Sequence, residues 1–175
     1  ENIDTYSVRL KELIDSVKYY TGRPKVNIVA FSMGGLVTRR YLQVFGENEV
    51  NKVVLIGTPN KGIVGEISQY CPIIGEKREC SDMNADSLFI KKLNSGVQPS
   101  IPVHNIIGTG CVMEEGLGDG VVLEEKAKLD NFANYFINGS CESTVKPLHL
   151  ELRDIEKYPE VYNIIIKALN DTLPK

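Results

Sequence analysis

Short apolar runs rich in β-branched residues alternate with an amphipathic segment at the start of the chain. The clearest runs are residues 26–31 (V-N-I-V-A-F) and 51–57 (N-K-V-V-L-I-G). Such runs predict strands buried on both faces of a parallel sheet. Residues 4–20 carry apolar side chains at spacings of three and four, which predicts a helix with Asp4 as its N-cap. This alternation indicates right-handed crossovers and an α/β fold, a mostly parallel sheet with flanking helices.

The rest of the chain continues the pattern less regularly. Strands are predicted at residues 102–109 and 132–137, loops at 110–120 and 138–147, and a final helix at 156–173. Residues 61–100 do not fit the alternation. A long insertion at the rim of a site is usually functional, so we expect a cap or lid here, with a short helix near residues 87–93. The alternative is a set of helices that only packs on the sheet.

An abrupt strand-to-helix turn is predicted at Ser32-Met33-Gly34-Gly35. A serine at such a turn is lifted off the end of the sheet, and its neighbours must be small. Ala30 and Gly34 stand at the two required places. The stretch therefore predicts a nucleophile elbow, G-x-S-x-G, with Ala in place of the first Gly. The alternative is that Ser32 only caps the helix after it.

A serine nucleophile needs a base, and the chain has two histidines, His104 and His149. His104 begins a predicted strand, whereas His149 follows the last strand in a loop that could reach the serine. Asp119, between glycines after the third strand, is the candidate acid that would orient the base. The order Ser, Asp, His is that of α/β-hydrolases. Other carboxylates compete with Asp119 for this role: Asp82, Asp86, Asp130, Glu114 and Glu115.

The loop at residues 58–62 follows a buried strand at its carboxyl end, where open α/β sheets bind ligands. We therefore expect this loop to form part of the pocket wall. The residues predicted to contact substrate are Phe31, Thr58, Pro59 and Asn60.

Length, net charge and cysteine content narrow the class of protein. A length of 175 residues suits a single domain, and a net charge of −3 with interspersed signs argues against a nucleic-acid partner. No apolar stretch approaches the length of a membrane span. No metal or organic cofactor is indicated, although a structural cation near Asp119 or Glu114 stays open. The cysteines allow the disulfides Cys71–Cys80 and Cys111–Cys141 or four free thiols; we slightly favour a secreted or extracytoplasmic protein over an intracellular one.

Four motifs resemble those of lipases and esterases of the α/β-hydrolase type: V-N-I-V-A-F-S-M-G-G-L, L-I-G-T-P-N-K-G, G-D-G-V-V and L-H-L-E-L. The resemblance implies Ser32 as nucleophile, Asp119 as acid and His149 as base. It also implies that the backbone N–H of Met33 is one donor of the oxyanion hole.

Members of this family begin with strands upstream of the elbow, and a loop there supplies the second oxyanion donor. The sequence has no counterpart, and the strand at 26–31 has one evident partner. We therefore expect that a missing N-terminal segment or a second chain completes the sheet.

The sequence thus predicts a serine hydrolase that cleaves carboxylic esters through an acyl-serine intermediate. The apolar residues of the presumed lid favour a lipid-like ester over a small polar one. Acyl transfer and thioester hydrolysis by the same residues stay open. A further alternative, from a different class, is a non-catalytic α/β-hydrolase-like binding module.

Overall fold

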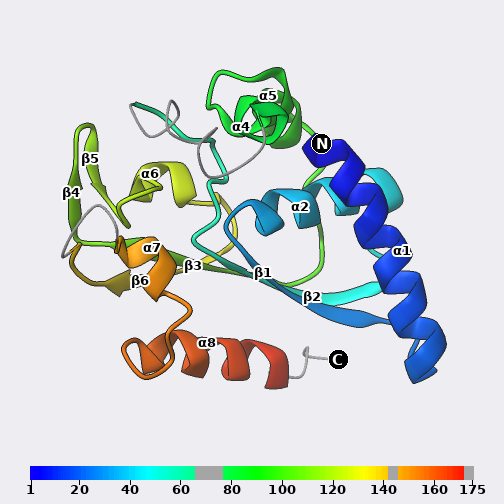
Figure 1. The fold of residues 1–175 in the computed structure, drawn as a ribbon. Coiled ribbons are helices and arrows are strands. Elements are labelled where there is room, and N and C mark those ends of the chain that lie inside the picture. Colours follow the sequence, from blue (N-terminus) through cyan, green and yellow to red (C-terminus); the bar gives the residue numbers. More distant parts are fainter. Residues whose placement is uncertain (66–76, 142–145, 172–175) are drawn as a thin grey trace.

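A computed structural model describes residues 1–65, 77–141 and 146–171 of the chain. Four parallel strands form one sheet in the order β1-β2-β3-β6. Helices lie on both faces of this sheet (Figure 1). The strands are β1 (Val26–Phe31), β2 (Val50–Ile56), β3 (Val103–Thr109) and β6 (Ala133–Asn138). All four predicted strands are therefore confirmed, each within one or two residues of its predicted bounds.

The described helices connect or flank these strands (Figure 1). They are α1 (Ile3–Thr21), α2 (Met33–Phe45), α4 (Lys77–Met83), α5 (Leu88–Ser95), α6 (Glu124–Ala127), α7 (Leu148–Glu151) and α8 (Pro159–Asn170). No helix in the described ranges is long and apolar enough to cross a membrane.

The central strand β2 divides the core into two layers because its side chains alternate between the faces of the sheet. Val53 and Leu55 pack toward α1 and α2, in a cluster with Ile14 and Tyr41. Val54 and Ile56 pack toward α8, in a cluster with residues such as Val161. Each face of β2 is therefore covered, and the sheet holds the turns at its carboxyl end on a rigid base.

Strand β1 differs from the prediction that both of its faces are buried. Asn27 is exposed and Val29 is 46% exposed. Among the described strands β1 pairs with β2 alone, and α8 covers β2 rather than β1. Ala30, on the opposite face, is buried against α2.

The described part of the 61–100 segment packs on helices. Ile63, Met83 and Ile90 join Ile3 and other residues of α1 and α2 in one buried cluster. The predicted short helix is α5, whose N-cap Ser87 accepts a hydrogen bond from the Ile90 amide at 3.0 Å. Residues 66–76 lie outside the described residues, so the cap over Ser32 stays a prediction.

Three local features differ from the predicted ones: a helix cap, a hairpin and the start of a helix. Asn2, not Asp4, caps α1, since its side chain accepts from the Thr5 amide at 2.9 Å. The predicted loop at 110–120 contains a hairpin of two three-residue strands, β4 (Cys111–Met113) and β5 (Gly116–Gly118). The final helix begins at Pro159 rather than Glu156 because proline suits the first turn of a helix, where its missing N–H has no partner to lose.

Candidate active site

Ser32 occupies a strained turn between β1 and α2. Its φ of 52° and ψ of −126° lie outside the regions that non-glycine residues favour. The Ser32 amide donates to the Ile56 carbonyl at 2.8 Å, which fixes the turn against β2. The Ser32 side chain makes no capping hydrogen bond to α2, so the reading of Ser32 as a simple helix cap is wrong.

The tightest packing at this turn is at Gly35 rather than at Gly34. A Cβ on Gly34 would lie 3.8 Å from the Ala30 Cβ, an ordinary contact. A Cβ on Gly35 would lie 2.0 Å from the Thr58 hydroxyl. The demand for a small residue therefore comes mainly from the loop after β2, where Thr58 is fully buried against the start of α2.

A chain of hydrogen bonds joins Ser32, His149 and Asp119. The Ser32 Oγ lies 3.0 Å from His149 Nε2, and His149 Nδ1 lies 2.7 Å from Asp119 Oδ2. Both His149 and Asp119 are almost completely buried. The structure thus brings together the three residues predicted from three distant parts of the sequence. His149 lies on the short helix α7, not in the loop that was predicted.

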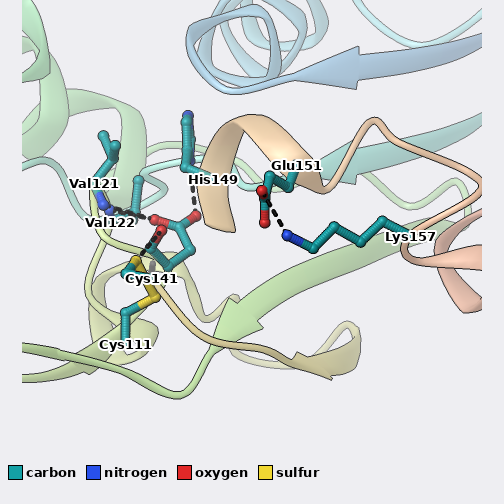
Figure 2. The surroundings of a disulfide bond; sticks show 8 residues. Cys111, Val121, Val122, Cys141, His149, Glu151 and Lys157 are labelled. Carbon is teal, nitrogen blue, oxygen red and sulfur yellow. Dashed lines mark hydrogen bonds and ion pairs between the residues drawn. A yellow bond between two sulfur atoms is a disulfide. The ribbon is translucent and has the colours of Figure 1, made fainter. Parts of the chain in front are cut away.

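Backbone groups hold the Asp119 carboxylate in place. Its Oδ1 accepts hydrogen bonds from the amides of Val121 at 2.9 Å and Val122 at 2.7 Å (Figure 2). The main-chain carbonyl of Asp119 accepts from the His149 amide at 2.8 Å. Because both amides bind Oδ1, the other carboxylate oxygen, Oδ2, is left to accept from the imidazole of His149.

Two glycines that the sequence analysis missed make room for this pair. A Cβ on Gly57 would lie 3.1 Å from His149 Nδ1 and 3.4 Å from Asp119 Oδ2. A Cβ on Gly108, in β3, would lie 2.7 Å from the Asp119 Cβ. Gly57 also has a φ of 57°, which glycine adopts without cost. The sequence offered one signal: both glycines end apolar runs at the carboxyl edge of the sheet.

Phe31 lies beside the histidine. Its ring centroid is 4.9 Å from that of His149, and the Arg153 guanidinium lies 4.6 Å from the Phe31 centroid. The Phe31 ring is only partly buried. It therefore steadies one side of the imidazole and stays accessible.

The other three residues predicted to contact substrate lie in the loop after β2. Thr58, Pro59 and Asn60 are all buried, and Asn60 has no exposed surface. The Asn60 side chain donates to the Ala127 carbonyl at 2.7 Å, and the main-chain carbonyl of Asn60 accepts from Arg39 at 3.1 Å. These contacts brace the loop after β2 from behind the site.

Arg39 is the centre of this brace. It is 5% exposed, and its described hydrogen-bond acceptors are neutral: the Asn60 carbonyl and side chain and the side chains of Asn94 and Gln98. Burial lowers the pKa of Arg39 to about 10. The hydrogen bonds connect α2 with the loop after β2 and with α5.

The other candidate residues lie apart from this hydrogen-bond chain. His104 is hydrogen-bonded through Nδ1 to the Tyr135 hydroxyl at 3.0 Å, and burial lowers its pKa. Asp82 accepts from the Ile3 amide at 2.9 Å, and Asp130 is paired with Lys61. The remaining competitors, Asp86, Glu114 and Glu115, are exposed.

Cys111 and Cys141 form a disulfide next to Asp119 (Figure 2), so the alternative of four free thiols is wrong. The other predicted pair includes Cys71, which lies outside the described residues. Within the described ranges, no group of three or more His, Cys, Asp or Glu side chains is placed to hold a metal ion.

Solved structures resemble this arrangement of strands and helices. The mature lipase BlEst2 of Bacillus licheniformis has a TM-score of 0.68 at 17% identity, with 92% of this chain and 75% of that chain covered. The phospholipase PlaB of Legionella pneumophila has a TM-score of 0.76 at 11% identity over 98% of this chain and 47% of that one. The carboxylesterase CesB of Bacillus subtilis has a TM-score of 0.61 at 12% identity over 99% of this chain and 68% of that one.

These likenesses define the fold as that of an α/β-hydrolase. The model of the class 2 lipase family matches residues 4–118, well over half of the chain. The chain therefore belongs to the class 2 lipases, which places it among enzymes that hydrolyse carboxylic esters. No curated protein matches the chain.

Proposed function

We propose that this chain hydrolyses esters through an acyl-serine intermediate, with Ser32 as nucleophile, His149 as general base and Asp119 as the acid. The observation that carries the proposal is the hydrogen-bond chain from Ser32 Oγ through His149 to Asp119, at 3.0 and 2.7 Å. In this arrangement His149 takes the hydroxyl proton as Ser32 attacks the carbonyl. It then returns the proton to the departing alcohol, while Asp119 stabilises the imidazolium.

The backbone N–H of Met33 is the proposed first oxyanion donor. Met33 is the first residue of α2, and the first N–H groups of a helix have no acceptor within it. They also lie at the positive end of the helix dipole, which favours an anion. An oxygen that becomes negative above Ser32 would accept from this amide.

We also propose that a segment outside the described residues completes the site. Among the described strands β1 pairs only with β2, so its other edge is open to a further strand or a second chain. Its side chain Val29 is also 46% exposed. Such a segment would supply the second oxyanion donor, and loss of one donor typically costs about 10²–10³ in turnover. Cooperative unfolding of this chain as a monomer, with turnover typical of esterases, would contradict this proposal.

A lipid-like ester is the proposed substrate. Two leucines close in sequence to the proposed catalytic residues are about half exposed: Leu150, next to His149, at 45%, and Leu117, two residues before Asp119, at 51%. Exposed apolar side chains beside a site favour an apolar ligand.

The experiment that tests the proposal is Ser32→Ala, assayed on 4-nitrophenyl butyrate and with a fluorophosphonate probe. We expect turnover to fall by about 10⁶-fold and mass mapping to find the probe on Ser32 in the unaltered chain. Ser16→Ala is the matched control, because Ser16 lies exposed on α1. Activity that survives Ser32→Ala would refute the assignment. A folded chain that neither turns over ester nor takes the probe would mean that the site is incomplete in this chain.

Acyl transfer stays as the second candidate because the same three residues would carry it. The acyl-serine is then resolved by an alcohol instead of water. Product analysis with added glycerol distinguishes the two, since transfer yields a glycerol ester and hydrolysis yields free acid.

A further inference from the structure

The Cys111–Cys141 disulfide joins the two segments that carry the proposed acid and base. Cys111 opens β4 directly after β3, and Cys141 follows the end of β6. Asp119 lies beyond the β4–β5 hairpin, and His149 lies on α7, which follows Cys141 in the chain. The covalent bond therefore holds the bases of two loops at a Cα–Cα distance of 5.3 Å.

The disulfide also touches the loop that holds Asp119. The Cys141 Sγ lies 3.6 Å from the main-chain carbonyl oxygen of Asp119 (Figure 2). A Cβ on Gly120, the next residue, would lie 2.6 Å from the same sulfur. The Asp119 carbonyl is the group that accepts from the His149 amide at 2.8 Å. One carbonyl thus contacts both the disulfide and the helix of the proposed base.

The Asp119 loop is anchored on one side by the buried Val122, and on the other side it meets the disulfide and Pro147. Glycines flank Asp119 on both sides, and Gly120 has a φ of 89°. A glycine-rich backbone has much conformational freedom, which must be removed by contacts with its surroundings. The sulfur packed against Gly120 and the Asp119 carbonyl supplies such a contact.

We propose that the Cys111–Cys141 disulfide is a positioning element for the proposed catalytic residues. It holds the Asp119 loop at the distance from α7 at which Asp119 Oδ2 meets His149 Nδ1. This inference rests on the proposed function, and it adds a structural requirement: full turnover needs the disulfide as well as the three reacting side chains.

The first test replaces both cysteines with serine and measures kcat and KM on 4-nitrophenyl butyrate. A shift of the loop by about 1 Å can cost on the order of 10²-fold, so we expect kcat to fall by about 10- to 100-fold. KM should change little, because the disulfide does not contribute to the exposed apolar surface. Ser16→Ala serves again as the control, because Ser16 lies exposed on α1. Unchanged kcat in a folded double variant would overturn the proposal.

The second test is a double-mutant cycle with Asp119→Asn. If the disulfide acts through Asp119, its removal should cost little further kcat once the acid is gone. If it only stabilises the fold, the two losses should multiply, and that result would also overturn the proposal. Ser32→Ala distinguishes failure of the proposed function from failure of this inference. Activity that survives Ser32→Ala refutes the proposed function. Loss of activity in Ser32→Ala together with full activity in the cysteine variant refutes this inference alone.

A third variant keeps the test decisive if the double serine variant does not fold. Gly120→Ala leaves the disulfide intact but places a Cβ 2.6 Å from the Cys141 sulfur and 2.9 Å from the Pro147 Cβ, which displaces the loop. We expect the same loss of kcat and the same non-additivity with Asp119→Asn. Full activity in a folded Gly120→Ala chain would show that the sulfur contact does not set the position of Asp119.

Discussion

Individual glycines determine how closely the proposed catalytic residues can approach the sheet. Gly35, Gly57 and Gly108 each stand where a Cβ would press on Thr58, His149 or Asp119. These constraints are invisible in the sequence, because a glycine at the end of an apolar run does not reveal what lies opposite it. The residues that the structure brings together, Ser32, Asp119 and His149, could be predicted from their order, but the space around them could not.

Gly57→Ala should lower kcat by about tenfold. The added methyl would lie 3.1 Å from His149 Nδ1 and would push the imidazole from Asp119. Gly22→Ala is the control, because Gly22 has a similar φ of 64° but no atom within 4 Å of the added Cβ. Both variants carry the strain of a left-handed alanine, on the order of 1 kcal/mol. Equal kcat in the two variants would show that Gly57 does not protect the geometry of His149.

Asn60→Ala tests whether Asn60 contacts the substrate or only holds the loop after β2. The variant removes buried hydrogen bonds to Ala127 and Arg39, so we expect unfolding free energy in urea to drop by about 2–4 kcal/mol. KM should not change, since Asn60 has no exposed surface. Asn163→Ala, at an exposed position of α8, should leave both quantities unchanged. A raised KM with unchanged stability would restore the original prediction.

At the scale of elements, periodicity predicted the long helices and the four strands of the sheet. It missed β4 and β5, because three-residue strands with glycine at both ends of β5 have no alternation to detect. It missed α4, whose sequence K-R-E-C-S-D-M is mostly polar, and it placed His149 in a loop because α7 is a single turn. The burial of Asn60 was not predicted for a similar reason: its partner Arg39 lies on α2, which sequence spacing does not show.

Elements are also tied by charge at the opposite end of the sheet. Glu49, beside the start of β2, accepts from Lys18 and from Lys11, at 3.3 Å, on α1 and from the Tyr41 hydroxyl on α2. The hydrogen bond from Lys18, followed by those from Tyr41 and Lys11, lowers the pKa of Glu49 below its ordinary value. One carboxylate thereby joins two helices to the central strand.

Glu49→Gln should reduce the amount of unfolding free energy that the protein loses when the pH falls below about 4.5. Because the folded-state pKa is depressed, the stabilisation is fully present above the unfolded value of 4.5 and is lost as pH falls through the folded pKa. Urea unfolding at pH 7 and pH 3.5 measures the difference, which should shrink in the variant. Glu12→Gln is the control, because Glu12 is exposed on α1, and it should leave the difference between the two pH values unchanged. An unchanged pH dependence in Glu49→Gln would contradict this account.

At the scale of the whole molecule, the last helix is fastened to the middle of the sheet by one buried lysine. Lys52 of β2 is 5% exposed, and its ammonium donates to the carbonyls of Ala168, Leu169 and Asp171 at the end of α8. These carbonyls lack partners within the helix, and a cation there also favours the helix dipole. α8 in turn packs in one buried cluster with Leu148 of α7, the residue before His149.

Lys52→Met should keep the volume but leave these carbonyls without their donor. We expect a loss of about 1–3 kcal/mol in unfolding free energy and faster amide hydrogen exchange in the last turn of α8. Lys167→Met, exposed in the same turn, should change neither quantity appreciably. Unaltered exchange in the Lys52 variant would show that the helix end does not depend on this cation.

Ser32 and His149 are 117 residues apart in the chain, yet their side chains lie within 3.0 Å. The serine turn needs only β1, β2 and α2, whereas the histidine arrives with α7, after β6 has joined the sheet. Loops that long close late during folding, because their entropy must be overcome before the contacts that reward it can form. After dilution from denaturant, ester turnover should therefore recover more slowly than the helical circular dichroism signal. The recovery of turnover then reports the rate of the final step of folding.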